Sequence, residues 1–279
     1  MKIRPRVGRV RYINCEPVYY AIERGVVQAS VRIVDGTPTR LNELLREGAL
    51  DVSVISALEY VYHPELYLLL PDLAIACDGA VESVLFLSRV PPEALHGRKA
   101  LLTRKSLTAR YLIRLLFERL YRVAPLFVEE DLSDGLTLPE DAFGVLLIGD
   151  EALRAKAKRL LPHVMDLGSS WKELTGMPFV FAVWAVRRDF YEAYQEEVHA
   201  LHQALLASKA WSQSHVEAIA FEVHERVGLD LETCSAYLQG RLSFDLTPRH
   251  LEGFSVFLKM LEEGGKLQAP EAFQFIGAG

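Results

Sequence analysis

Hydrophobic residues follow two different periods along this chain, one typical of strands and one typical of helices. The stretch from Asp78 to Arg89 has an alternating and then nearly continuous apolar run after its Gly, and Phe179 to Arg188 is of similar character, which predicts two strands buried on both faces. The long segment between them alternates strand-like and helix-like stretches, as a small α/β domain does. We therefore predict that the chain leaves one lobe through the first run and returns to it through the second.

The other apolar runs predict an α/β protein up to residue 188 and a purely helical region after it. Strands are expected at 6–12, 29–34, 51–55, 73–77, 99–103, 126–128, 143–148 and 163–167. Helices are expected to begin near Val18, Pro38, Ala57, Leu107, Gly149 and Trp171. Alternation of strand and helix favours mixed, mostly parallel sheets with right-handed crossovers. From Asp189 two apolar helical stripes follow, and these helices are expected to wrap the first lobe.

Capping residues fix where several of these helices begin. Thr37 before Pro38 predicts an N-cap with proline in the first turn. Ser56 followed by Glu59 has the spacing of a capping box. Ser56 thus has two interpretations, a helix cap or a ligand contact at a strand end, and the pattern does not separate them.

The length predicts two lobes. A chain of 279 residues is large for one core, and the two buried runs divide it into a discontinuous lobe of residues 1–88 and 185–279 and an inserted lobe of residues 89–184. A cleft between the lobes is the expected ligand site. The predicted fold is therefore a two-lobe α/β fold with a helical C-terminal tail.

Charge and composition exclude several classes of protein. A formal net charge of −6 argues against a nucleic-acid binder, which needs a basic face. No apolar run is long enough for a membrane span, and the basic start of the chain lacks the apolar core of a signal peptide, so we expect a cytoplasmic protein. Cys15, Cys77 and Cys234 have no metal-binding spacing, so neither disulfide framework nor metal site is predicted.

Polar residues cluster at the predicted carboxyl ends of strands, the edge where open α/β sheets bind ligands. Helix N-termini there offer free N–H groups to an anion, which suits a small carboxylate. The candidates from this pattern are Asn14, Ser56, Ser83, Ser106, Thr108, Gly149 and Asp150, and Leu107 joins them as part of the helix start between Ser106 and Thr108. Gly79 adds a position that permits close backbone approach, and Phe179, which alternates with Phe181, serves either core packing or ring stacking.

Several catalytic signatures are missing from the sequence. Hydrolase-elbow, P-loop and dinucleotide fingerprints do not occur. Cys15 beside Asn14 is a conceivable nucleophile, but no partner base is visible in the sequence. The structural interpretations of Asn14 and Ser83 are a turn residue and a hydroxyl that bonds the backbone at a strand crossing.

Six stretches, in order and spacing, resemble the chorismate dehydratase family of the futalosine route to menaquinone, which has a periplasmic-binding-protein-like fold. They are Arg11-Tyr12-Ile13-Asn14 with Pro17, Asp51 to Tyr60, Leu70-Pro71-Asp72, Gly79 to Val84, Leu147 to Leu153, and Trp171 to Ala182. The phrase typical of the sister enzyme, 1,4-dihydroxy-6-naphthoate synthase, is absent from the first loop.

The resemblance implies conversion of chorismate to 3-[(1-carboxyvinyl)oxy]benzoate and water, with no cofactor and no obligatory protein partner. It implies that Asn14 and Ser83 act on the substrate. The proton acceptor stays open between a substrate carboxylate and the side chains of Glu16, Glu59 and Glu82. A solute-binding or ligand-sensing protein for a small aromatic carboxylate is the alternative, because the same fold serves both uses.

Overall fold

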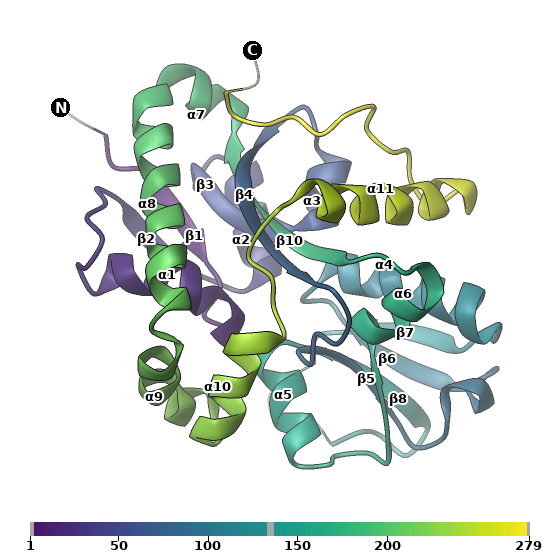
Figure 1. Cartoon of the computed structure of the whole chain (residues 1–279). Coiled ribbons are helices and arrows are strands. Elements are labelled where there is room, and N and C mark those ends of the chain that lie inside the picture. Colours follow the sequence, from purple (N-terminus) through teal and green to yellow (C-terminus); the bar gives the residue numbers. More distant parts are fainter. Residues whose placement is uncertain (1–2, 133–136, 278–279) are drawn as a thin grey trace.

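Two five-stranded mixed sheets form the frame of the computed structural model, which describes residues 3–132 and 137–277 (Figure 1). The first sheet has the spatial order β2 (Arg32–Asp35), β1 (Arg6–Arg9), β3 (Val52–Ser56), β10 (Phe179–Arg187) and β4 (Tyr67–Cys77). The second has the order β7 (Leu126–Glu130), β6 (Lys99–Thr103), β8 (Ala142–Ile148), β5 (Val84–Ser88) and β9 (His163–Asp166). We call the first sheet, with the helices packed on it, lobe 1, and the second sheet, with its helices, lobe 2.

Helices follow most strands of both sheets, as the sequence predicts. In lobe 1 they are η1 (Ile13–Cys15), α1 (Glu16–Glu23), α2 (Pro38–Arg46) and α3 (Ala57–Tyr62). In lobe 2 they are η2 (Pro92–Ala94), α4 (Leu107–Leu116) with its π-helical end η3 (Phe117–Tyr121), α5 (Gly149–Ala157) and α6 (Leu167–Thr175). The predicted cap of α2 is confirmed, because the Thr37 side chain accepts a hydrogen bond from the Arg40 N–H.

The strand directions confirm a mixed α/β fold but contain more antiparallel pairing than the predicted mostly parallel sheets. Strands β1, β2 and β3 pair in parallel, as do β6, β7 and β8. The antiparallel pairs all involve β5 or β10, the strands next to the two crossings between the lobes. A chain that enters a sheet from the other lobe approaches it from the opposite end, which explains the reversed direction.

The two crossings lie between β4 and β5 and between α6 and β10. The lobe boundaries at residues 88 and 184 stay a prediction. Strand pairing favours crossings slightly before these residues, because β5 lies within the second sheet and β10 within the first. The first crossing is held in place by Asp166, whose carboxylate accepts the N–H groups of Val81 at 3.1 Å and Glu82 at 2.7 Å.

The C-terminal helices contact both lobes rather than wrapping the first alone. They are α7 (Arg188–Ala193), α8 (Gln195–Gln213), α9 (Val216–Val227), α10 (Leu231–Gly240) and α11 (Pro248–Glu263). Helix α8 runs along α1, whereas α10 lies next to α5 in Figure 1 and α9 packs on α10. Their apolar residues pack with Ile13 of lobe 1 and Leu153 of lobe 2 in one cluster. The helical region is therefore placed to support whatever lies between the lobes.

Candidate functional site

A cavity lies between the two lobes, where the carboxyl ends of β1 and β3 face the N-termini of α4 and α5. It holds about 550 Å³ of space free of protein atoms, part of it open to solvent. Its polar lining comes from Asn14, Ser56, Ser83, Ser106 and the backbone at Gly149. The apolar lining comes mainly from Val10, Tyr12, Val54, Ile55, Ile75, Val84, Ile148 and Phe181. A concave, mostly apolar site with a few convergent polar groups is typical of a small-molecule site.

Asn14 sits in the short 3-10 turn η1, between β1 and α1. The Ile13 N–H in this turn donates to the Asp150 carboxylate of lobe 2 at 2.9 Å, so the turn is tied across the cleft. The side-chain oxygen Oδ1 of Asn14 is buried, and no hydrogen-bond partner for it occurs among the described residues. A buried polar atom without a partner is costly, and at a functional site it points to a ligand that would satisfy it.

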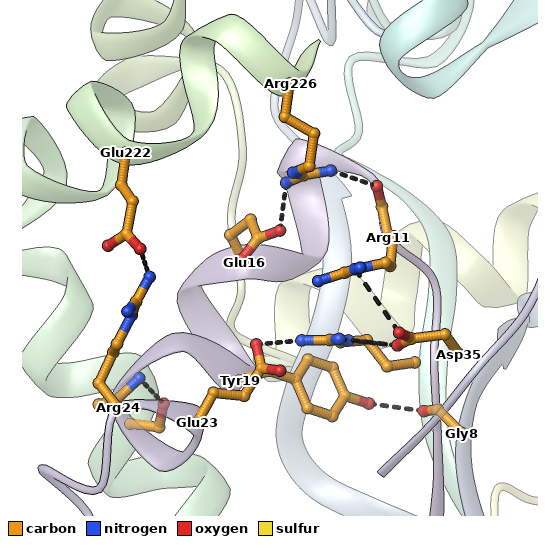
Figure 2. Close-up of polar contacts among 12 residues, drawn as sticks. Gly8, Arg11, Glu16, Tyr19, Glu23, Arg24, Asp35, Glu222 and Arg226 are labelled. Carbon is orange, nitrogen blue, oxygen red and sulfur yellow. Dashed lines mark hydrogen bonds and ion pairs between the residues drawn. The ribbon is translucent and has the colours of Figure 1, made fainter.

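Arg226 of α9 holds both ends of the turn that carries Asn14. Its guanidinium donates to the Arg11 carbonyl at 2.9 Å and pairs with the buried Glu16 carboxylate (Figure 2). Burial raises the pKa of Glu16, and the charge of Arg226 opposes that shift. The Arg226–Glu16 pair therefore holds the turn from the side away from the cavity. Glu16 itself is not among the described residues that line the cavity.

Ser83 lies on the first crossing and is fixed by hydrogen bonds of both its backbone and its side chain. Its carbonyl accepts the Gly149 N–H at 2.7 Å, and its side-chain Oγ accepts the hydroxyl of Tyr237 at 2.7 Å. Tyr237 belongs to α10 and is completely buried. The sequence gives no sign of this partner, because Tyr237 is far along the chain in a helix whose pattern indicates only packing.

Gly149 begins α5 with a positive φ of 61°, a backbone conformation that favours glycine. A side chain here would also collide with Tyr12, because an added Cβ would lie 2.6 Å from the Tyr12 ring. The Tyr12 ring of lobe 1 therefore packs directly on the backbone of lobe 2 at the cavity wall. This contact requires glycine for both backbone conformation and space.

Ser56 does not form the capping box that its spacing with Glu59 predicts. Its Oγ instead accepts the Thr108 N–H at 3.0 Å and lies 2.6 Å from Thr108 Oγ1, in the other lobe. Thr108 Oγ1 in turn accepts the Leu58 N–H at 3.0 Å. The capping box does not form because the Thr108 hydroxyl of lobe 2 accepts the Leu58 N–H, which lies in the first turn of α3. Ser106 does cap its helix, accepting the Ala109 N–H at 3.2 Å.

Five of the ten predicted residues line the cavity and five do not. Asn14, Ser56, Ser83, Ser106 and Gly149 meet there. Thr108 and Asp150 instead bind the opposite lobe, and Gly79 and Leu107 lie outside the described lining. Phe179 is buried against Trp171 and Phe257, whereas Phe181 lines the cavity. A register shift between Val180 and Ala182 interrupts the alternation on which the choice of Phe179 was based.

The remaining candidate bases and the candidate nucleophile are engaged elsewhere or neutral. Glu59 pairs with Arg46 at 2.7 Å, and Glu82 pairs with Lys156 at 3.1 Å and Arg241 at 3.0 Å. Neither is among the described lining residues. Burial raises the pKa of the Cys15 thiol, which keeps it protonated and a poor nucleophile.

No charged side chain occurs among the described residues that line the cavity. An anion there would meet hydroxyl and amide donors and the positive ends of α4 and α5. In the same described part of the chain, no group of three or more His, Cys, Asp or Glu side chains is arranged to hold a metal ion. None of the helices in residues 3–132 and 137–277 is both long and apolar enough to cross a bilayer.

Comparison with known proteins identifies the family. A family model described as menaquinone biosynthesis matches residues 5–263. The chain belongs to the menaquinone biosynthesis family. Within this family it is 33% identical to the chorismate dehydratase of Thermus thermophilus over 244 residues, which cover 81% of this chain and 84% of that protein. It is 26% identical to the 1,4-dihydroxy-6-naphthoate synthase of the same organism over 72% of this chain and 71% of that protein.

Solved structures confirm the periplasmic-binding-protein-like fold of this family member. A protein from Archaeoglobus fulgidus superposes with a TM-score of 0.72 and 20% identity, covering 94% of this chain and 98% of the other. The periplasmic aliphatic sulphonate binding protein of Escherichia coli superposes with a TM-score of 0.62 and 14% identity, covering 95% and 94%. At these identities the likeness concerns the fold alone.

Proposed function

We propose that this protein is a chorismate dehydratase, a lyase that converts chorismate to 3-[(1-carboxyvinyl)oxy]benzoate and water in menaquinone biosynthesis. Membership of the menaquinone biosynthesis family supports an enzyme of this pathway. Curated chorismate dehydratases at 33% identity in Thermus thermophilus and 27% in Campylobacter jejuni support the specific reaction. The cavity between the lobes is the proposed active site.

The observation that carries the proposal is the buried Asn14 Oδ1, which has no partner in residues 3–132 and 137–277 and lies in the same cavity as the Ser83 hydroxyl. Chorismate carries one alcohol group, at ring C4, which must leave as water. An amide oxygen that accepts the proton of this hydroxyl and a serine that donates to its oxygen would hold and polarise the leaving group. In the proposal Asn14 and Ser83 are these catalytic residues.

The reaction balances without an added reagent. The C3–H bond breaks, its electron pair forms the new ring double bond between C3 and C4, and the C4–O bond breaks. The C3 proton passes from its acceptor to the departing hydroxide, which leaves as water, and the product ring is aromatic. Because aromatisation supplies driving force, orientation and electrostatic polarisation are the main contributions asked of the protein.

The two carboxylates of chorismate require donors, and the cavity offers neutral ones. In the proposal the ring carboxylate lies at the N-terminus of α4, where the Ser106 hydroxyl and the helix field favour an anion. Thr108 acts indirectly, because its hydroxyl already bonds Ser56 and Leu58. The ring packs against Phe181 and the aliphatic lining.

The proton acceptor in this proposal is the enolpyruvyl carboxylate of chorismate itself. The placement of Glu16, Glu59 and Glu82 supports this choice, because all three pair with basic groups outside the cavity lining. Each Glu→Gln variant should keep substantial turnover. An inactive variant that still binds chorismate would identify that glutamate as the base and overturn the substrate-assisted step.

The test is to incubate the purified protein with chorismate and follow the loss of diene absorbance together with product mass. We expect a product lighter than chorismate by one water, formed much more slowly, but still measurably, in Asn14→Ala and Ser83→Ala. Saturable binding without turnover would instead favour a solute-binding or sensing role. Turnover of the naphthoate synthase substrate, with none of chorismate, would favour the sister activity.

A further inference from the structure

The C-terminal helix α10 reaches the proposed active site through one side chain, Tyr237. The Tyr237 ring is completely buried in the cluster formed by α9, α10, Ile13 and Leu153. Its hydroxyl donates to Ser83 Oγ at 2.7 Å. Ser83 itself lines the cavity, so Tyr237 is one hydrogen bond behind a proposed catalytic group.

We propose that Tyr237 is a positioning residue that orients the Ser83 hydroxyl, so that Ser83 presents its proton to the leaving hydroxyl of the substrate. The inference rests on the proposed dehydratase function and adds a residue to it.

The direction of the hydrogen bond is what matters chemically. A serine hydroxyl has one proton to donate and two lone pairs to accept with. With one lone pair engaged by Tyr237, the Ser83 proton is available for a second partner, and a hydroxyl that accepts one hydrogen bond is a stronger donor in the next. The hydrogen bond from Tyr237 thus makes the Ser83 hydroxyl a stronger donor to the hydroxide that leaves the substrate.

Burial keeps the Tyr237 phenol protonated, so it remains available as the donor of this hydrogen bond. The pKa of Tyr237 is raised well above its ordinary value, mainly by burial, and the nearby Asp150 carboxylate adds to the effect. The phenol therefore stays protonated over the working pH range. The backbone of Ser83 is equally constrained, since its carbonyl accepts the Gly149 N–H. Because both the phenol and the Ser83 backbone are held in place, the rotamer of the Ser83 hydroxyl is restricted.

The test compares Tyr237→Phe with Tyr19→Phe. Tyr19 is an equally buried tyrosine, which donates to the Gly8 carbonyl at 2.9 Å and accepts from Trp184 at 2.9 Å, away from the cavity. We expect Tyr237→Phe to lower kcat about tenfold, the worth of one hydrogen bond, with little change in KM. Tyr19→Phe should lower the melting temperature while kcat is kept.

A double-mutant cycle separates positioning from general stability. In a Ser83→Ala background, Tyr237→Phe should cause little further loss of kcat, because the hydroxyl on which it acts is gone. Equal losses in both backgrounds would overturn the proposal, as would full activity of Tyr237→Phe. An inactive wild type would overturn the dehydratase proposal and this inference with it, so the two failures are distinguishable.

A fluorinated tyrosine at position 237 keeps the test decisive where Tyr237→Phe does not fold. Fluorination makes the phenol a stronger donor and changes its size little. A kcat that rises with fluorination supports a role of Tyr237 in strengthening donation by Ser83, and a kcat that does not change overturns that role.

Discussion

Ser56 Oγ and Thr108 Oγ1 lie 2.6 Å apart across the cleft, so a hydroxyl at the end of β3 and one in the first turn of α4 join the two lobes. The Thr108 N–H and the Leu58 N–H complete the arrangement. Each hydroxyl satisfies a helix N-terminus of the other lobe. This reciprocal capping holds the lobes together at one wall of the cavity.

Replacing Thr108 by valine should weaken this closure. The Leu58 N–H would lose its acceptor, and the Ser56 hydroxyl would lose its hydroxyl partner but keep the N–H of residue 108, a cost of about 2 kcal/mol in the free energy of unfolding. Substrate affinity should fall more than kcat, because a looser cleft mainly affects binding. The measurements are denaturant unfolding and the KM for chorismate. Thr39→Val is the control: its exposed hydroxyl also spans the lobes, to the Arg104 carbonyl at 3.1 Å, and its loss should cost under about 0.5 kcal/mol.

Gly149→Ala should damage both the fold and the cavity. Its positive φ costs about 1–2 kcal/mol for alanine, and the clash with Tyr12 would push that ring from the cavity wall. Gly25→Ala is the matched control, because Gly25 has a similar φ of 69° and open space around it. Both variants should be less stable by thermal unfolding, but only Gly149→Ala should lose turnover. Normal turnover in Gly149→Ala would contradict a role for the Tyr12 contact.

Asn14→Leu should separate stability from activity. The substitution removes a buried oxygen that has no partner among the described residues, so the free energy of unfolding should stay equal or rise. Turnover of chorismate should fall about a hundredfold or more, as for loss of a group that stabilises the transition state. Asn42→Leu is the control, since Asn42 Oδ1 is similarly buried and unpartnered in the described structure but lies in α2, outside the cavity lining. It should keep wild-type turnover. An active Asn14→Leu would exclude Asn14 from catalysis.

Stability should fall on mild acidification, and His202 should account for part of the loss. Burial lowers the pKa of His202, whose Nε2 donates to the Pro71 carbonyl at 2.8 Å. Because the unfolded chain takes up a proton near pH 6.5 while the folded state resists it, the free energy of unfolding decreases as pH falls below that value. The slope is at most about 1.4 kcal/mol per pH unit for one proton. Urea unfolding between pH 7.5 and 5 should show a shallower slope for His202→Gln, and an unchanged slope would rule His202 out.

Most elements of the fold could be predicted from local sequence. The apolar runs predicted the strands from β1 to β10, and Thr37 and Ser106 marked the starts of α2 and α4. These signals are local: a strand needs a run of apolar residues, and a cap needs a side chain three residues from its N–H. The polar residues at strand ends also predicted five of the residues that now line one cavity.

Errors arose wherever the deciding contact came from a distant segment. Ser56 had a local capping pattern, but Thr108 of the other lobe takes its hydroxyl. Phe179 and Phe181 follow the same alternation, but an irregular register in β10 places Phe181 at the cavity and Phe179 in the aromatic core.

By itself, the sequence determined which segments form most strands and helices, where helices such as α2 and α4 begin and which polar groups lie at strand ends, because periodicity and capping act over a few residues. Only the tertiary structure decided which of those groups meet. Tyr237 donates a hydrogen bond to Ser83, and Arg226 donates one to the Arg11 carbonyl beside the turn of Asn14. Both contacts form because the C-terminal helices bury their apolar stripe against both lobes. Such contacts depend on how whole elements pack, and no short pattern in the chain encodes them.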